Sequence, residues 1–305
     1  MGILTIREKW AHLTPRLHAR DIIEVPFNLI PSAVWTPHAS SEEHRVVERP
    51  WHLAQLNHWA IRQDFDLLTR GRTSLAIPSH VRHSGTEIFI EPGARLEHVV
   101  LNATEGPIYI GKGATVMDGA LLRGPVSVGE GATVKMGAQL YGGTTVGPYA
   151  IAGGEIKNSI LSDYANKGHH GYLGDAVVGR WCNLGAGTSC SNVKNNAGTV
   201  NVMSMYSGEF LHAGQKCGLI MGDFSRSAIN TSFNTGTVTG VCANVFGNDG
   251  LTPKFIPSFS HGCSGERSDL SKEIRSITAW MRMKGQEPGK ELLERIERTY
   301  SLTNP

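Results

Sequence analysis

The sequence predicts a mainly β protein whose central part is a parallel β-helix of six-residue repeats, flanked by α-helices. Aliphatic residues recur at every sixth position from Ile110 to Ala152, usually with a small residue two places before each. Glycines at 111, 129 and 147 are 18 residues apart, which is three repeats. A helical period of 3.6 residues cannot produce this series. A strand-and-turn unit repeated three times per coil instead makes a triangular prism with a continuous core.

The repeat sets the expected extent of the β-helix. Its aliphatic positions are Ile110, Val116, Leu122, Val128, Val134, Leu140, Val146 and Ala152. The register begins near Ile90 and, after a gap that ends at Val178, resumes more weakly as far as Val245. We expect the small residues where the interior is narrow, and the glycines where the backbone needs positive φ. The β-helix is therefore predicted over residues 77–263.

Helical patterns flank the repeat on both sides. Apolar residues at roughly helical spacing over 43–70, including two tryptophans, predict a helix that packs on the first coils. Two amphipathic segments within 268–300, separated by GQEPG, predict helices that cover the open end of the prism. The first 40 residues have no usable period. The expected parts are an N-terminal segment 1–42, a helical segment 43–76, the β-helix 77–263 and a helical cap 264–305.

Composition narrows the classes of function. Charged residues make up 18% of the chain and the formal net charge is +2, so no basic field points to nucleic acid. The five cysteines are odd in number and form no C-x-x-C pair, which favours reduced thiols and no structural zinc. The sequence has neither a signal-peptide pattern nor an apolar run near 20 residues. We expect a soluble cytoplasmic protein that binds neither membrane nor metal.

The gap in the register, between Ala152 and Val178, is rich in polar residues. Insertions that interrupt a solenoid tend to form loops on one face, often the binding face. The polar side chains in and after the gap are Glu155, Lys157, Tyr164, Asn166, Lys167, His169, His170, Tyr172, Asp175, Asn183, Asn192 and Lys194. We therefore expect a polar loop here that carries the functional site.

The run KGHHGYLGDAVVGRWCNLGAGTSCSN, residues 167–192, resembles a known family. The acetyltransferase half of bifunctional N-acetylglucosamine-1-phosphate uridyltransferase / glucosamine-1-phosphate acetyltransferases carries G-H-x-x-Y-L-G-D-A-x-[IV]-G-x-x-x-N-[IL]-G-A-G-T, followed by C-N. Flanking segments over residues 49–261 resemble a related bacterial group of sugar-nucleotidyltransferase-like proteins. The resemblance implies a left-handed β-helix, a homotrimer with sites between subunits, acetyl-CoA as co-substrate and a sugar phosphate or nucleotide sugar as ligand.

The resemblance also implies roles for individual residues. The H-x-x-Y spacing places the catalytic histidine of the family on His169 and not on His170. The family's sugar and sugar-phosphate contacts fall on Lys157, Tyr172 and Asn183. The arginine that binds the phosphate in the family aligns near Lys135, across an insertion of about four residues.

The resemblance further implies contacts to acetyl-CoA and to the amino sugar. Ala186, in GAGT, aligns with a residue whose backbone contacts acetyl-CoA. The family's C-N pair is C-S-N here, so Asn192 stands opposite the family's asparagine. The lysine six residues later is replaced by Gly198, and Lys194 is available to substitute for it. This departure leaves the identity of the amino sugar open.

The chemistry is consistent with these residues. An ammonium must lose a proton before it can attack a thioester, and histidine is a suitable base near neutral pH, a role that falls to His169. Positioned reactants and backbone donors toward the developing oxyanion supply most of the remaining acceleration. Lys157 and Lys135 would hold a phosphate as point charges.

Other functions stay open at this point. Residues 1–76 lack the L-x-A-G-x-G-T-R-M-type loop of the family's nucleotidyltransferase domain, and GILTIREKW resembles a segment from inside that domain, so 1–42 looks abbreviated. A sugar-nucleotide-binding or nucleotidyltransferase-related protein is the first alternative. The second is a γ-class carbonic anhydrase, although no two histidines have its H-x4-H spacing. A purely structural prism is the third.

Overall fold

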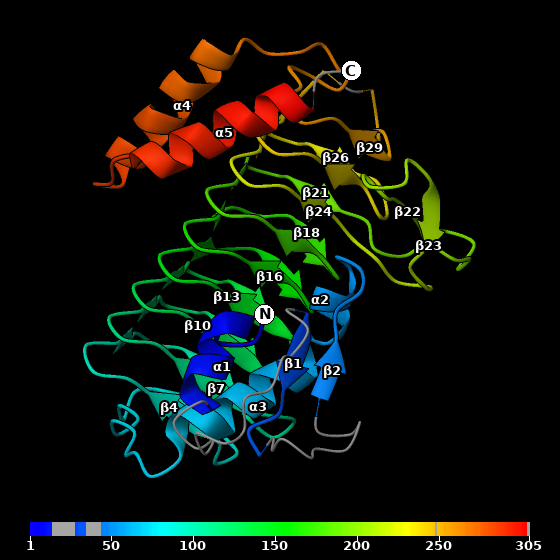
Figure 1. The fold of residues 1–305 in the computed structure, drawn as a ribbon. Coiled ribbons are helices and arrows are strands. Elements are labelled where there is room, and N and C mark those ends of the chain that lie inside the picture. Colours follow the sequence, from blue (N-terminus) through cyan, green and yellow to red (C-terminus); the bar gives the residue numbers. More distant parts are fainter. Residues whose placement is uncertain (14–27, 35–43, 248, 304–305) are drawn as a thin grey trace, which may run out of the picture.

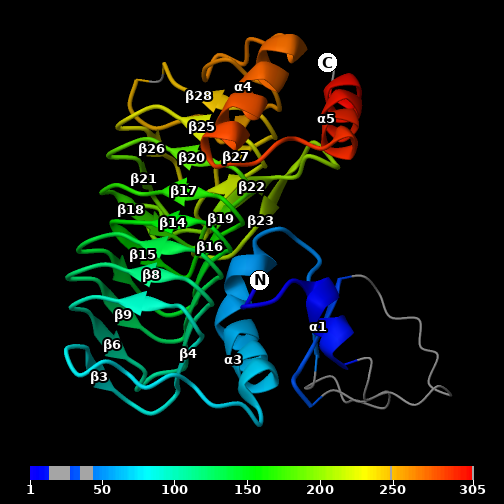
Figure 2. The same ribbon diagram turned by 90° about the vertical axis from the view of Figure 1, so that its left-hand side faces the viewer.

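The computed structural model describes residues 1–13, 28–34, 44–247 and 249–303. Within these ranges the strands form three parallel sheets, which are the walls of a triangular prism (Figures 1 and 2). The coils wind left-handed as the chain rises from β4 to β29, as the two views together show. The predicted fold class, a left-handed parallel β-helix with flanking α-helices, is confirmed.

The three walls are named here in the order in which each coil visits them. The first wall contains β4 (Ile88–Ile90), β7 (Ile108–Ile110), β10 (Val126–Val128), β13 (Thr144–Val146), β16 (Ile160–Leu161), β19 (Val177–Val178), β24 (Ile220–Met221), β27 (Val238–Thr239) and β29 (Phe255–Ile256). The second contains β5 (Arg95–Leu96), β8 (Thr115–Val116), β11 (Thr133–Val134), β14 (Ile151–Ala152), β17 (Asn166–Lys167), β20 (Asn183–Leu184), β25 (Arg226–Ser227) and β28 (Asn244–Val245). The third contains β3 (Arg82–Ser84), β6 (Val100–Asn102), β9 (Leu121–Arg123), β12 (Gln139–Leu140), β15 (Glu155–Lys157), β18 (Tyr172–Gly174), β21 (Ser189–Cys190) and β26 (Ser232–Phe233).

The six-residue period arises because each step of six moves the chain to the next wall. Val128, Val134 and Leu140 lie on the first, second and third walls, and their side chains are buried on the axis of the prism. The small residues two places earlier, such as Ala132 and Ala138, are fully buried at the corners. One continuous apolar cluster therefore runs the length of the prism.

Glycine is required at the repeat position for a reason that differs from the predicted one. Gly111, Gly129 and Gly147 do not have positive φ. A Cβ on Gly129 would instead lie 2.7 Å from the backbone nitrogen of Pro148 in the next coil. Positive φ occurs two residues later, at Gly113 (φ 64°) and its equivalents. The spacing of 18 residues thus marks close contact between the backbones of successive coils.

Substitution of Gly129 by alanine should therefore destabilise the prism. The added methyl group forces two backbones apart, and overpacking of this kind costs about 1–3 kcal/mol. The matched control is Gly113→Asn, because this corner is open and asparagine tolerates positive φ. Urea denaturation of both variants tests the prediction. Equal stability of Gly129→Ala and the parent protein would contradict it.

The gap in the register does not contain the predicted inserted loop. The walls continue through residues 152–178, and the period is lost because corners are shorter. Ile156 follows Ala152 on the axis after four residues instead of six, and Val178 follows Leu173 after five. The prism loses residues at these corners but keeps all three ladders.

The main insertion leaves the prism after β21, at residues 191–219. It contains the antiparallel hairpin of β22 (Asn201–Met203) and β23 (Phe210–His212). The apolar side of the hairpin, with Val200 and Val202, packs against Trp51. Figure 1 shows the hairpin projecting beside the upper coils. The sequence period resumes only weakly after this excursion because the chain must return to the prism at β24.

Helices cover the outer face of the first wall. The helix expected over 43–70 begins later and is divided into α2 (His52–Gln55) and α3 (Asn57–Thr69). It is preceded by β2 (His44–Val46), which pairs with β1 (Leu29–Pro31), while α1 (Ile6–Leu13) lies near α3 (Figure 2). The Asn57 amide donates to the Gly143 carbonyl at 2.6 Å, which fixes the start of α3 on the prism.

A buried ion pair joins α1 to α3. Lys9 and Asp64 are each 1% exposed and form a salt bridge. The second carboxylate oxygen of Asp64 accepts hydrogen bonds from the backbone amides of Ile3 (2.7 Å) and Leu4 (3.0 Å). Burial raises the pKa of Asp64 and lowers that of Lys9, so each group depends on the other to stay charged.

Two helices close the far end of the prism, as Figure 1 shows. They are α4 (Leu270–Met283) and α5 (Lys290–Leu302). The side chain of Asp269 caps α4 by accepting from the amide of Lys272. Ile277, Met281 and Ile296 pack against Phe224, Cys242 and Phe259 at the corner between the first and second walls.

Candidate functional site

The shortened fourth coil (β13, β14, β15) leaves a pocket on the third wall. Its volume is about 290 Å³, and it lies between the third coil (β10, β11, β12) and the fifth (β16, β17, β18). The lining residues are Gly137, Gln139, Gly154, Glu155, His170, Gly171 and Tyr172. Because the corner at Gly153 and Gly154 is two residues short, the histidine-bearing corner of the next coil overhangs open space. We call this hollow the third-wall pocket.

The turn from Gly168 to Gly171 carries both histidines. His169 and His170 are exposed, and it is His170 that lines the third-wall pocket. The Lys167 ammonium donates to the carbonyl of His169 and, at 3.3 Å, to that of Gly153. Gly171 has φ 120°, and a Cβ there would lie 2.0 Å from the Thr188 carbonyl oxygen. The turn is thus held from inside the prism and from the coil above.

Lys167 was expected in a polar loop, but it lies inside the prism. It follows Ala152 in the second-wall ladder and is 1% exposed. Burial lowers the pKa of Lys167 to about 8. The sequence did contain a signal, because Lys167 lies six residues after Leu161 and six before Leu173, where the register calls for an aliphatic residue.

A hydrogen-bonded network connects two of the predicted site residues at the corner between the third and first walls. The Asn192 amide donates to the Tyr172 hydroxyl at 3.2 Å and to the Asp175 carboxylate. The other carboxylate oxygen of Asp175 accepts from Asn158 at 2.7 Å. Burial, followed by the charge of Asp175, raises the pKa of Tyr172 to about 12, so its hydroxyl keeps its proton at neutral pH.

Asp175 and Asn158 were not assigned as site residues from the sequence. Both have positive φ, 48° and 46°, which aspartate and asparagine tolerate better than most residues do. Their place in the network follows from the stacking of two corners 17 residues apart. Because this stacking depends on the shortened coil, the hexad register did not bring these residues together.

The predicted lysines lie at two different corners. Lys157 is exposed at the end of β15, on the strand next to Tyr172, and pairs in register with Gly174. Lys194 is half-buried and near Lys254, whose pKa is lowered first by burial and then by the charge of Lys194. Lys135 follows β11 at the corner between the second and third walls. Lys254 is a further cation beside Lys194, and it was not assigned to the site from the sequence.

The remaining two predicted residues, Asn183 and Ala186, lie on and just after the second wall. Asn183 is on β20 of the second wall, where its side-chain oxygen accepts from Asn166 at 2.6 Å. Ala186 follows β20 at the corner between the second and third walls, one coil above His169. Its carbonyl accepts a hydrogen bond from the amide of Asn230 at 2.7 Å. The predicted residues therefore extend from the outer face of the second wall, around one corner and across the third wall.

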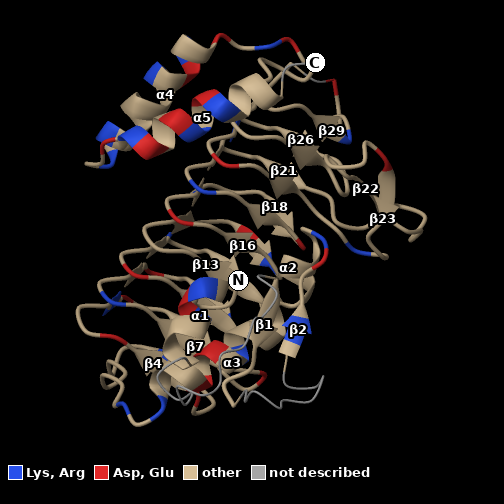
Figure 3. Ribbon diagram, viewed as in Figure 1, with Lys and Arg blue, Asp and Glu red and all other residues tan. Residues whose placement is uncertain are grey.

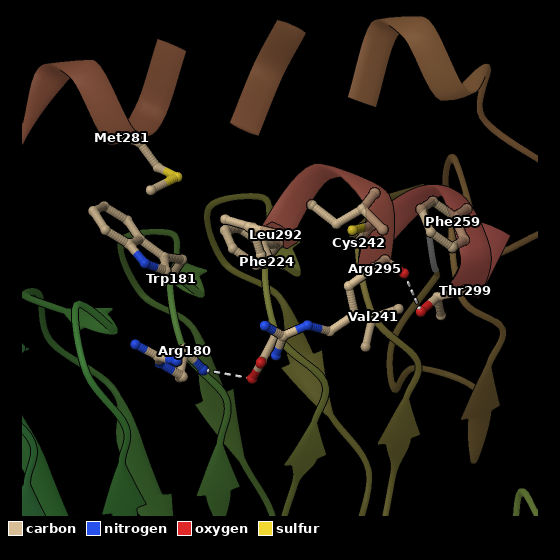
Figure 4. A pocket seen from close by; sticks show the side chains of 12 residues that line it. Arg180, Trp181, Phe224, Val241, Cys242, Phe259, Met281, Leu292, Arg295 and Thr299 are labelled. Carbon is tan, nitrogen blue, oxygen red and sulfur yellow. Dashed lines mark hydrogen bonds between the residues drawn. The ribbon is translucent and has the colours of Figure 1, made fainter. Parts of the chain in front are cut away.

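A second cavity lies away from these residues, between α4, α5 and the prism (Figure 4). It is about 280 Å³ in volume, and its apolar lining includes Trp181 and Phe224 from the prism and Met281 from α4. Tyr149, Tyr164 and Trp181 form a column of stacked rings that ends at this cavity, with 4.1 Å between the centroids of Tyr164 and Trp181. The column supports the corner on which the helices pack.

Acidic and basic segments alternate along the corners and on α4 and α5 in the view of Figure 3. Cys182, Cys190, Cys217 and Cys242 are buried free thiols, and burial raises the pKa of each. In the described ranges, no three His, Cys, Asp or Glu side chains come together as a metal site. None of the helices in that part of the chain is long and apolar enough to cross a bilayer.

The fold and this polar pocket define a left-handed β-helix protein with a candidate site on its third wall. No protein-family model matches the chain. It is 34% identical over 88 residues to the bifunctional protein GlmU of Methanococcus maripaludis and 32% identical over 88 residues to that of Methanocaldococcus jannaschii. These matches cover 28% of this chain and 20% and 21% of the relatives, so the chain spans about a fifth of their length.

A longer match of lower identity is found in bacteria. The bifunctional protein GlmU of Marinobacter nauticus is 28% identical over 155 residues, which is 46% of this chain and 34% of that protein. The resemblance predicted from residues 167–192 is thereby confirmed. Among solved structures, the polySia-specific acetyltransferase NeuO gives a TM-score of 0.32 at 14% identity, covering 59% of this chain and 80% of that one. A UDP-N-acetylglucosamine acyltransferase from Campylobacter jejuni gives 0.25 at 13%, covering 74% and 83%.

Proposed function

We propose that this chain is an acyltransferase that moves an acetyl group from acetyl-CoA to the amine of a sugar phosphate. The observation that carries the proposal is the exposed His169 turn, which contains the run that resembles the family's motif and lies at the edge of the third-wall pocket, in a chain similar to GlmU proteins. His169 is the proposed general base. Glucosamine 1-phosphate is the first acceptor to test, because the resemblance points to it.

The proposed reaction needs one proton acceptor and two binding regions. The imidazole of His169 removes a proton from the substrate ammonium, and the free amine attacks the thioester carbonyl. The C–N bond forms and the C–S bond breaks. The departing thiolate then takes the proton from the imidazolium, and the second proton lost by the nitrogen passes to solvent, so that the products are the neutral amide and the free thiol. Holding both reactants beside this base supplies much of the acceleration, because their approach no longer costs translational entropy.

The chain offers groups for each part of the substrates. Lys157 and Lys135 are the proposed phosphate contacts, and Tyr172 is the proposed donor to the sugar. Lys194 is the proposed substitute for the family's lysine that Gly198 replaces here. Asn192 orients Tyr172 through their hydrogen bond and is also the proposed contact to acetyl-CoA, together with the backbone of Ala186. Asn183 is the remaining proposed sugar contact. Buried free thiols fit a reducing compartment such as the cytoplasm.

A homotrimer is the proposed assembly. Asn183 lies on the second wall, whereas Tyr172 lies on the third. One small ligand that contacts both residues would have to lie against surfaces of two walls. A neighbouring subunit completes such a site in this proposal, as the resemblance implies. Light scattering coupled to size-exclusion chromatography tests the assembly. A monomer with full acetyl transfer would contradict it.

The test of the proposed function is thiol release from acetyl-CoA. The acceptors are glucosamine 1-phosphate, galactosamine 1-phosphate, glucosamine without phosphate and UDP-glucosamine. Turnover with an amino-sugar phosphate and formation of the acetamide by mass spectrometry are expected. Binding of UDP-N-acetylglucosamine by calorimetry without thiol release from any amine would replace this proposal by sugar-nucleotide binding.

Removal of the Lys157 charge should weaken binding of the acceptor selectively. Hydrogen bonds to charged groups contribute about 1.5–3 kcal/mol, so Lys157→Met is expected to raise the acceptor KM by roughly 10- to 100-fold with little change in kcat. Lys112→Met is the matched control, because Lys112 is exposed at a different corner. The KM for glucosamine without phosphate should not change. An equal effect on both acceptors would contradict a phosphate contact.

A further inference from the structure

Lys167 is a cation on the axis of the prism. Its neighbours in the second-wall ladder include Ala152 below and Leu184 above, both buried in the apolar core. A buried cation is costly unless it is paired, and within the described ranges its hydrogen bonds go to two neutral carbonyls. An aliphatic residue would serve the core better, so the presence of lysine calls for another reason.

The two carbonyls that Lys167 binds belong to consecutive coils. Gly153 is in the shortened corner of the fourth coil, and His169 is in the turn directly above it. The His169 carbonyl points inward so closely that a Cβ on Gly154 would lie 2.8 Å from its oxygen. The side chain of His169, by contrast, is exposed on the outside of the prism. The ammonium therefore fixes the backbone from which the imidazole projects.

We infer that Lys167 is a positioning residue for His169, which holds the histidine turn against the shortened corner from inside the prism. This inference rests on the proposed function, because it assigns Lys167 a role in acyl transfer through His169. Lys167 does not touch the substrates, since its side chain is buried on the axis. The lysine compensates for the shortened corner, because its ammonium supplies the hydrogen-bond donors that join this corner to the turn above it.

The pH dependence of this contact has a definite sign. Burial lowers the pKa of Lys167 to about 8, below its unfolded value. The folded state therefore binds this proton less tightly than the unfolded state, and the cost of burying the charge is full below pH 8 and disappears as the pH rises from about 8 towards 10.5. The titratable neighbours on the adjacent elements are His169 and His170 on the same turn, Glu155 on β15 and Tyr172 on β18.

The decisive variant is Lys167→Met, which keeps an unbranched side chain of similar length and removes the charge and the donors. We expect it to unfold at the same or a higher temperature than the parent protein at pH 7, with this difference shrinking at pH 10. We expect kcat for acetyl transfer to fall by about 10- to 100-fold, while the KM for acetyl-CoA stays within about threefold. A merely structural lysine would lower stability and activity together.

Two further variants keep the inference testable. Lys167→Gln retains a neutral donor and should recover part of kcat, whereas Leu184→Met changes the next position of the same ladder and should leave kcat unchanged. Hydrogen exchange of the amides of His170 and Gly171 should be faster in Lys167→Met. Normal kcat, or a clear loss of stability at pH 7, in Lys167→Met would overturn the inference. If the parent protein transfers no acetyl group, the proposed function fails, and unchanged exchange in Lys167→Met would separately refute the positioning of the turn.

Discussion

Replacement of His169 by alanine is expected to lower kcat for acetyl transfer by about 10²- to 10⁴-fold, the usual contribution of a positioned general base. The KM values should change little, because the side chain acts on the proton and not on the phosphate. Steady-state thiol release with saturating acetyl-CoA measures the effect. Far-UV circular dichroism should show an unchanged fold, since His169 is exposed.

The adjacent histidine provides the sharpest control for this prediction. His170 lines the third-wall pocket, so His170→Ala is expected to raise the acceptor KM while kcat stays within a factor of a few. His83→Ala, on the exposed β3 strand, should change neither constant. If His170→Ala loses kcat and His169→Ala does not, the base is His170, and the assignment from the H-x-x-Y spacing is wrong.

Loss of one partner of the buried Lys9–Asp64 pair should cause the largest fall in stability. Lys9→Met leaves an uncompensated carboxylate, and Asp64→Ala leaves an uncompensated ammonium and two unpaired amides. Breaking a buried pair in this way costs about 3–5 kcal/mol. We expect this loss in urea denaturation, together with faster hydrogen exchange at the amides of Ile3 and Leu4.

Changing both partners together should restore much of that stability. In Lys9→Met with Asp64→Asn, the asparagine oxygen still accepts from the two amides and no charge is buried alone. The exposed pair of Arg282 and Glu287 is the control, and Glu287→Gln should cost less than about 1 kcal/mol. A double variant as unstable as the sum of the two single ones would show that the charges themselves are not responsible.

The prism could be predicted from the sequence because its core imposes a rule at every sixth residue. Val116 and Val134 stack directly on the same wall, so any polar residue there would be buried on the axis. The rule fails where corners lose residues, after Ala152. The sequence then offers no way to tell an inserted loop from a shortened coil, because both break the period.

The candidate site was only partly predictable for the same reason. The run around His169 and Tyr172 forms one turn and the strand after it, so these two predicted residues lie close together in the fold. Lys167 was placed in the same polar group, although it lies inside the prism. Its spacing of six residues from Leu161 and Leu173 indicated the inward position, but the pairing with Ala152 that places it there follows from the shortened corner. Contacts between coils, such as Asn158 with Asp175, need the spacing of the coils to be known.

The N-terminal elements and the hairpin could not be predicted from any period. The segment around α1 is held by polar groups far apart in the sequence, such as Asn57 and Thr145, whose pairing no local pattern reveals. The hairpin after β21 packs through a few apolar residues on Trp51. Both are additions whose positions depend on the prism they cover.

The shortened corner at Gly153 has a consequence for how proteins of this architecture diversify. Strands on the three walls pair coil by coil, so a corner can lose residues while every ladder stays intact. A lineage can therefore acquire a new cavity by deletion, without a new loop or domain and without disturbing the fold. The same route is open to protein engineers, who could shorten one corner of an idealised solenoid and place a functional side chain on the coil above it.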